Sequence, residues 1–133
     1  MKNRAFVALV IVMAVVLAGV AQQKSKKASA PKGKELSYKK NIVPIFKKYC
    51  LPCHTEDNMN PSELYLESYA DLMKGGKHGP PVVAGNPDSS TMIQKLGLKP
   101  PFGDPMPYKF KREFPADTLA ILEKWIAQGA KNN

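Results

Sequence analysis

Both cysteines of the chain and one of its two histidines stand within five residues, Cys50-Leu51-Pro52-Cys53-His54. The spacing C-x-x-C-H is typical of covalent haem attachment. Two thiols separated by two residues lie about one backbone turn apart, so each can reach one vinyl group of a single haem and form a thioether. His54 is then carried under the ring, where its imidazole can bind the iron. We therefore predict that Cys50, Cys53 and His54 bind one haem per chain.

Two other uses of the C-x-x-C pair stay open. A disulfide or thiol redox pair suits an oxidising or a reducing compartment respectively, but it gives His54 no role, and no alternating strand pattern surrounds residue 50 as a thioredoxin-like site needs. A structural zinc ion usually takes four Cys or His ligands. Only the distant His78 could complete that set, and the spacing is unlike that of ordinary zinc fingers.

A low-spin electron-transfer haem needs a ligand on the second face of the iron, usually Met or His. The favoured candidate is Met106 in the segment Asp104-Pro105-Met106-Pro107. A thioether binds iron weakly, so the protein must hold it in place, and the flanking prolines stiffen the backbone that presents it. We predict that His54 and Met106 are the two iron ligands.

The remaining candidates for the second ligand are Met59, Met73, Met92 and His78, and an open site is a further alternative. Met59 lies too near His54 in the chain to cross the ring comfortably. Met73 and Met92 fall on apolar faces of short predicted helices, where methionine commonly fills the core. His78 stands in a Gly-rich loop, and we expect it to be exposed.

Residues 1–21 have the pattern of a secretory signal peptide. Lys2 and Arg4 give a basic start, and the seventeen residues from Ala5 to Ala21 carry no charged or polar side chain. Small residues precede the polar Gln22, as a signal peptidase requires. A run of this length is also at the short edge of a membrane span, so a retained N-terminal anchor is the alternative. Either way we expect the rest of the chain to be periplasmic or otherwise exported, or held on the outer side of the inner membrane.

Residues 22–36 are predicted to be a basic, disordered linker because the segment has no aromatic residue and no periodic apolar face. This segment carries much of the formal net charge of +9. From residue 36 onward, thirteen Lys and Arg stand against ten Asp and Glu, which leaves +3. The high isoelectric point therefore gives no reason to expect a nucleic-acid partner. A solubilising spacer is a simpler role for the linker than attachment to an anionic surface.

The third segment, residues 37–133, is predicted to be one all-α domain of about four helices and long loops. Apolar periodicity and end signals predict helices over residues 37–50, 67–74, 89–96 and 115–129. Ser37 can cap the first, in which Pro44 either stands in the first turn or kinks a longer helix. Gly129 can end the last. Two loops rich in proline leave a thin apolar core, and a buried haem would supply the missing apolar centre.

Taken together, these features resemble the single-haem, class I c-type cytochromes, a bacterial cytochrome c domain family. The resemblance covers Ser37 to Ala130 and rests on the C-x-x-C-H after an N-terminal helix, the Pro-Met-Pro segment, and the ending of the last helix, Trp125–Ala130. It implies a fold in which the first and last helices cross beside the haem edge. By that analogy Phe46 or Tyr49 packs against Leu122 or Trp125, with Trp125 in the core.

The resemblance implies an electron-transfer protein rather than an enzyme, in which Cys50, Cys53, His54 and Met106 take the attachment and ligand roles. Its partners would be redox proteins, and it would act as a monomer or as a subunit of a complex. The alternatives are a cytochrome module of a larger membrane or periplasmic redox complex and, with less support, an open-site haem enzyme such as a peroxidase. Six lysines are interpreted either as solvated surface charge or as a docking site on this protein for an acidic partner. They are Lys47, Lys48, Lys95, Lys99, Lys109 and Lys111.

Overall fold

The computed structural model describes residues 33–97, 100–108 and 114–133. These residues form four α-helices: α2 (Val43–Tyr49), α3 (Tyr69–Lys74), α4 (Thr91–Leu96) and α5 (Ala116–Ala127). A π-helical turn, η1 (Tyr38–Ile42), leads into α2. Within these ranges there is no β-strand, only an isolated bridge between Gly76 and Gly79. The all-α prediction is therefore confirmed at the level of helix content.

Residues 1–21 lie outside the described residues, as does most of the segment 22–36, so the signal peptide or anchor stays a prediction. In the part of the chain that the structure describes, no helix is both long enough and apolar enough to cross a membrane. Hydrogen bonding of the domain begins within the segment expected to be linker. Leu36 N–H donates to Gln128 Oε1 at 2.9 Å, and Gln128 Nε2 donates to Lys34 O at 3.2 Å.

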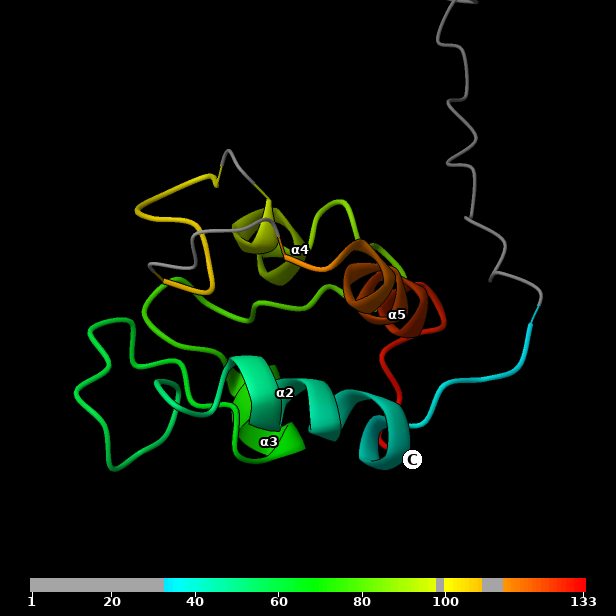
Figure 1. Cartoon of the computed structure of the whole chain (residues 1–133), viewed down its shortest axis with the longest axis horizontal. Coiled ribbons are helices and arrows are strands. Elements are labelled where there is room, and N and C mark those ends of the chain that lie inside the picture. The colour runs from blue at the N-terminus through cyan, green and yellow to red at the C-terminus, as the bar shows by residue number, and fades with distance from the viewer. Residues whose placement is uncertain (1–32, 98–99, 109–113) are drawn as a thin grey trace, which may run out of the picture.

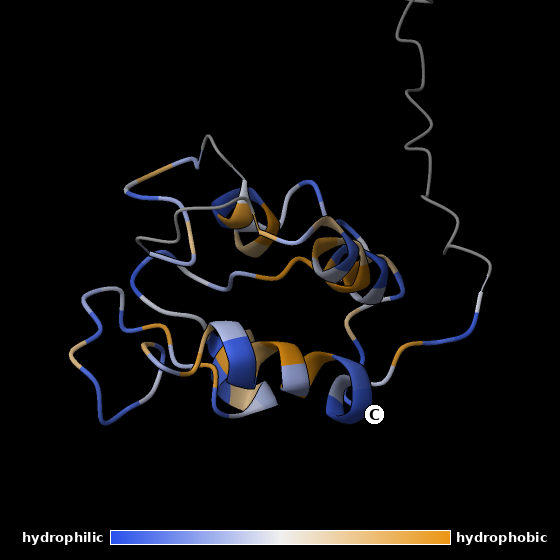
Figure 2. Ribbon diagram, in the orientation of Figure 1, coloured by the Kyte–Doolittle hydropathy of each residue, from blue (hydrophilic) through white to orange (hydrophobic). Residues whose placement is uncertain are grey.

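The helices form two layers, with α2 and α3 in one and α4 and α5 in the other (Figure 1). The layers are joined at one end, where η1 contacts α5, and α4 packs beside α5. The helices carry hydrophobic and hydrophilic positions side by side, as amphipathic helices do (Figure 2). Each helix therefore turns an apolar stripe toward the common core and leaves its polar positions to solvent.

The first predicted helix is divided at Val43. Ser37 caps it as expected, because its side chain accepts the N–H of Lys40 at 3.3 Å. Pro44 stands in the first turn of α2. Proline lacks an N–H group, and a first-turn N–H has no partner within the helix, so Pro44 costs little there. The turn before it is π-helical, so one predicted helix is two consecutive elements that run straight into Cys50.

The core forms where the first and last elements meet. Trp125 is fully buried, and its ring lies 5.7 Å from that of Tyr38. Tyr49 contacts Phe114, with ring centroids 5.1 Å apart. The buried cluster consists of Tyr38, Ile42, Ile45, Phe46, Leu66, Leu72, Val82, Phe114, Leu122, Trp125, Ile126 and Ala130. The prediction that Trp125 is a core residue is confirmed, and Phe46 belongs to the same cluster.

The end of α5 is a glycine-containing cap that closes the core. Gly129 has φ +99°, a conformation that glycine adopts without a steric penalty. Its N–H donates to Ile126 O, and the N–H of Ala130 donates to Trp125 O, both at 2.9 Å. This pair of bonds is a Schellman motif. The last helical residue is Ala127, and Gly129 belongs to the cap that ends the helix, as expected. Ala130 is buried.

Candidate functional site

The residues Cys50 to His54 form a single backbone turn directly after α2. Cys50 N–H donates to Phe46 O at 2.8 Å and continues the helix. The N–H groups of Cys53 and His54 both donate to Cys50 O, at 3.0 and 2.9 Å. Cys50 is half-buried, Cys53 is exposed, and neither forms a disulfide. The main chain therefore places Cys50, Cys53 and His54 within one backbone turn, as the spacing predicts.

Cys50 does not have the lowered pKa of a redox-active cysteine. Burial raises its pKa to about 12. The thiolate is the reactive form of cysteine, and thiol redox catalysts have a lowered pKa, so Cys50 lacks the property that a redox pair requires. Among the described residues, no three side chains of His, Cys, Asp or Glu converge as metal ligands, and the zinc alternative gains no support.

His54 is oriented by a backbone carbonyl. Its main chain is fixed by Leu66 N–H, which donates to His54 O at 3.0 Å, and its ring Nδ1 lies 2.9 Å from Leu64 O. A carbonyl oxygen only accepts, so Nδ1 carries the proton and donates, which leaves the lone pair on Nε2. Histidines that ligate metals commonly donate their other ring N–H in this way. Two thiols and an imidazole prepared for ligation fit a covalent haem.

A polar residue that the sequence analysis missed lies beside this contact. The Nδ2 atom of Asn60 donates to Leu64 O at 2.5 Å and lies 3.2 Å from His54 Nδ1. Its Oδ1 accepts the N–H of Ser62 at 3.2 Å and the Oγ–H of Ser62 at 2.7 Å. The sequence Asn60-Pro61-Ser62 does favour an Asx turn, but nothing in it points to His54.

The loop that carries Leu64 is held against a glycine. Lys77 N–H donates to Ser62 O at 2.8 Å. A Cβ atom at Gly76 would lie 2.3 Å from Ser62 O and 2.7 Å from Leu64 N. Both contacts are with backbone, which cannot move away cheaply. Only glycine at position 76 therefore allows the main chain there to lie this close to residues 62–64. This close approach fixes the position of Leu64, whose carbonyl oxygen contacts the His54 ring.

Met106 lies in a segment fastened to α4. Its N–H donates to Lys95 O at 2.6 Å, and its side chain is half-buried. The Lys95 amine donates to Phe102 O at 2.6 Å and also to Asp104 O, and it lies 4.8 Å from the centroid of the Phe102 ring. Burial lowers the pKa of Lys95, and the charge of Asp104 opposes that shift. Lys95 is thus a clamp on this segment rather than free surface charge.

The structure does not join Met106 to the Cys–His turn by any contact described above. In the view of Figure 1, the segment 100–108 lies in the layer of α4 and the turn after α2 lies in the other layer, on the same side of the molecule. The role of Met106 stays a prediction.

The other candidate ligands have different surroundings. His78 is exposed, and its ring stacks on that of Phe102, with centroids 4.0 Å apart and planes inclined by 23°. Met59 is fully exposed. Met73 and Met92 are partly buried against the core cluster, so their interpretation as core residues is confirmed. The lysines Lys99, Lys109 and Lys111 lie outside the described residues, and Lys47 and Lys48 are exposed.

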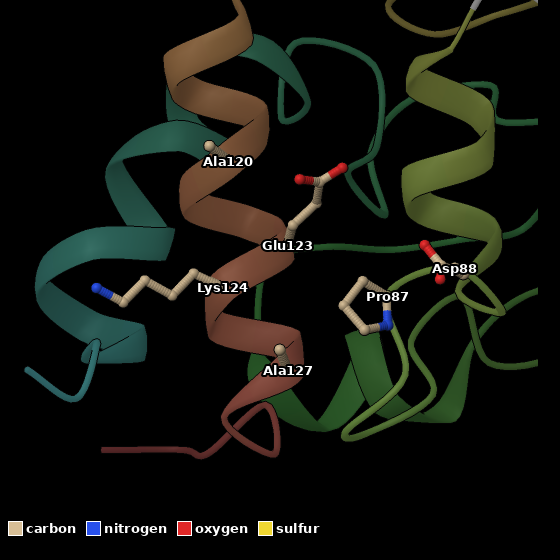
Figure 3. A pocket seen from close by; sticks show the side chains of 6 residues that line it. All are labelled: Pro87, Asp88, Ala120, Glu123, Lys124 and Ala127. Atoms are coloured by element: carbon tan, nitrogen blue, oxygen red, sulfur yellow. The ribbon is translucent and has the colours of Figure 1, made fainter. Parts of the chain in front are cut away.

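The structure also contains an open hollow of about 430 Å³ between α5 and the loop before α4, away from the Cys–His turn (Figure 3). Its lining is Pro87, Asp88, Ala120, Glu123, Lys124 and Ala127. No cysteine, histidine or methionine lines it. The hollow therefore offers no thiol, imidazole or thioether to a haem.

Residues 50–99 match the family model described as Planctomycete cytochrome C. The matched range begins at Cys50, includes His54, Asn60 and Lys95, and ends before Met106. The match supports a cytochrome c-like domain, a class of domain that implies haem c and electron transfer. Among curated proteins and among solved structures, no match is found.

Proposed function

We propose that this chain is an exported monohaem c-type cytochrome that carries single electrons between redox partner proteins. The observation that carries the proposal is the turn from Cys50 to His54. It presents two free thiols, and the Nδ1–H of His54 is bound to Leu64 O, which leaves Nε2 for the iron. The match of residues 50–99 supports the same class of site.

Each residue has a distinct role in the proposal. Cys50 and Cys53 form the two thioether bonds, and His54 is the first iron ligand. Met106 is the second ligand, held in place by the hydrogen bond from its N–H to Lys95 O. The haem iron supplies the one-electron redox change, while the protein supplies binding, ligand orientation and exclusion of water. Export follows from residues 1–21, whose apolar run marks a signal peptide or an anchor.

The proposal is tested by the visible spectrum of the full chain, exported by a bacterial host that has the haem-attachment machinery. Spectra are recorded in the ferric and dithionite-reduced forms, with a pyridine haemochrome on the denatured protein. The expected result is a covalent c-type haem with sharp low-spin reduced bands and a ferric far-red sulfur-to-iron band. The double variant Cys50→Ser/Cys53→Ser is the control, and it should contain no covalent haem.

Two results would contradict parts of the proposal. A colourless protein with a Cys50–Cys53 disulfide would exclude the cytochrome function. Covalent haem with a high-spin spectrum and rapid binding of cyanide or carbon monoxide would keep the attachment site but move the function toward ligand binding or catalysis. Fractionation of the same cells, with the mass of the purified chain, tests export and shows whether residues 1–21 are removed.

A further inference from the structure

The orientation of the Asn60 carboxamide is fixed by its neighbours. Its Oδ1 accepts two donors from Ser62, the main-chain N–H at 3.2 Å and the Oγ–H at 2.7 Å. The other end of the amide lies 2.5 Å from Leu64 O. A reversed amide would place two acceptor oxygens at that distance and would lose both bonds from Ser62. The NH₂ group of Asn60 therefore faces the carbonyl of Leu64.

The proton on His54 is fixed by the same carbonyl. Nδ1 lies 2.9 Å from Leu64 O, which only accepts. If the proton were on Nε2 instead, Nδ1 could accept from Asn60 Nδ2 at 3.2 Å, but its lone pair would then face the oxygen of Leu64. The shorter contact decides between the two tautomers. Leu64 O consequently accepts two N–H groups, one from His54 and one from Asn60.

Sharing the acceptor weakens the bond to the histidine. A carbonyl oxygen has two lone pairs and can accept both donors, but the second donor withdraws electron density from the first bond. The His54 N–H then keeps more of its hydrogen, and the imidazole donates less charge through Nε2. The partly positive NH₂ hydrogens beside the ring also disfavour added positive charge. Both effects disfavour an oxidised metal centre on His54 relative to a reduced one.

We propose that Asn60 is a positioning residue that raises the reduction potential of the protein by sharing the Leu64 carbonyl with His54. This inference rests on the proposed function, because it requires haem iron on His54. It does not depend on which residue is the second ligand, since the three atoms involved all lie on the His54 side of the site.

The test is the reduction potential of the haem-loaded full chain and of its Asn60→Ala variant at one neutral pH. The expected result is a lower potential in the variant. In the reduced, diamagnetic protein the Nδ1 proton of His54 should also move downfield in the NMR spectrum, because its bond to Leu64 O becomes stronger. A merely structural role for Asn60 would not move that proton in this direction.

The chain offers a matched control in Asn58→Ala. The Nδ2 atom of Asn58 donates to Pro52 O at 2.7 Å and so anchors the same loop. Asn58 is exposed, and its hydrogen bond to Pro52 involves neither His54 nor Leu64. The side-chain atoms removed are the same in both variants. A change in reduction potential caused by loosening of the loop should appear in both variants, whereas a change caused by loss of the second donor to Leu64 O should appear only in Asn60→Ala.

The isosteric variant Asn60→Asp provides a second measurement if the alanine variant does not fold. Its carboxylate can keep the contacts to Ser62, and the oxygen in place of Nδ2 must move away from Leu64 O, where it accepts from His54 instead of competing with it. The expected order of potentials is native chain, then Asn60→Ala, then Asn60→Asp at the lowest. The inference is overturned if both Asn60 variants hold covalent haem at the native potential, or if Asn58→Ala lowers the potential as much. Absence of covalent haem in the native chain, seen in the pyridine haemochrome, overturns the proposed function itself.

Discussion

The rings of Tyr38 and Trp125 lie 5.7 Å apart, with their planes inclined by 34°. Tyr38 is in η1 and Trp125 is in α5, so this contact joins the first and last elements of the domain. The indole N–H of Trp125 donates to Lys131 O at 3.1 Å, and Tyr69 Oη–H donates to Ala130 O at 2.8 Å. The main chain of Ala130 and Lys131, which follows α5, is thereby held by the side chains of Tyr69 and Trp125.

Trp125→Ala is expected to destabilise the haem-loaded protein by about 3–5 kcal/mol, because it removes a fully buried aromatic side chain and leaves a cavity. The measurement is the free energy of unfolding in denaturant. Ile121→Ala is the control on the same helix, since Ile121 is exposed, and its cost should stay near 0.5 kcal/mol, roughly the size of a surface substitution. Equal losses in the two variants would show that α5 does not pack as described.

Because of Tyr38, the free energy of unfolding is expected to fall in alkaline solution. Burial raises the pKa of its phenol, and the charges of Tyr69 and Asp71 raise it further. Above the ordinary tyrosine pKa of about 10, the unfolded chain loses this proton while the folded protein keeps it. The free energy of unfolding therefore falls as pH rises from that value through the raised pKa. Tyr38→Phe should make this fall less steep, as measured by denaturant unfolding across that range.

The control for this pH dependence is Tyr65→Phe, because Tyr65 is half-buried and lies outside the core cluster. It should keep the native slope. If Tyr38→Phe and the native chain lose stability in parallel above that pH, ionisation of Tyr38 is not the cause.

The two thiols predict separable effects on haem attachment. Cys50→Ser and Cys53→Ser should each leave one thioether, so the haem stays covalent but its pyridine haemochrome band moves to longer wavelength, because one vinyl group remains unsaturated. The half-buried Cys50 should also cost more stability than the exposed Cys53 when replaced by a hydroxyl. The measurements are the haemochrome and the intact mass. A native haemochrome in either single variant would exclude that thiol from attachment.

The second ligand is tested by Met106→Ala, which should abolish the ferric far-red sulfur-to-iron band and allow cyanide to bind rapidly. Met59→Ala is the matched control, because Met59 is fully exposed and the same side chain is removed. Its spectrum should equal that of the native protein. Persistence of the far-red band in Met106→Ala would assign the sulfur ligand to another methionine, and its absence from the native protein would favour His78 or an open site.

Lys95→Met tests the clamp on the Met106 segment. The variant keeps the alkyl chain but loses the amine bonds to Phe102 O and Asp104 O, each worth roughly 1–1.5 kcal/mol. Together the two bonds contribute about 2–3 kcal/mol, so opening of the segment should become about 30- to 150-fold more frequent, and the rate of cyanide binding should rise accordingly. Lys47→Met, at an exposed position of α2, should bind cyanide at the native rate. Equal rates in all three proteins would show that the segment does not limit access to the iron.

Local patterns were enough to predict the helices and the turn that carries the cysteines. Ser37, Pro44 and Gly129 each act through neighbours a few residues away, so their roles can be read from the sequence. The π-helical turn before Val43 was not predicted, because it depends on how η1 packs against α5 as well as on Pro44.

The support around His54 could not be predicted for a related reason. Leu64 contributes a backbone carbonyl, which every residue possesses, and Asn60 looks like an ordinary turn residue. Only the folded loop shows that both lie beside the imidazole. Lys95 was expected to be surface charge, yet its amine is occupied by two carbonyls of a segment that begins several residues later.

The close approach at Gly76 has a consequence for mutational tolerance. Even alanine at this position would press on Ser62 O and Leu64 N, and the segment that orients His54 would have to move. In a library of single substitutions screened by the red colour of the exported protein, Gly76 should therefore tolerate as little change as the cysteines, although it touches neither thiol. Gly85, where an added Cβ meets nothing within 4 Å, shares the positive φ of several loop glycines, and it should lose stability without losing colour. The proposed haem site thus constrains residues beyond the pentapeptide Cys50–His54.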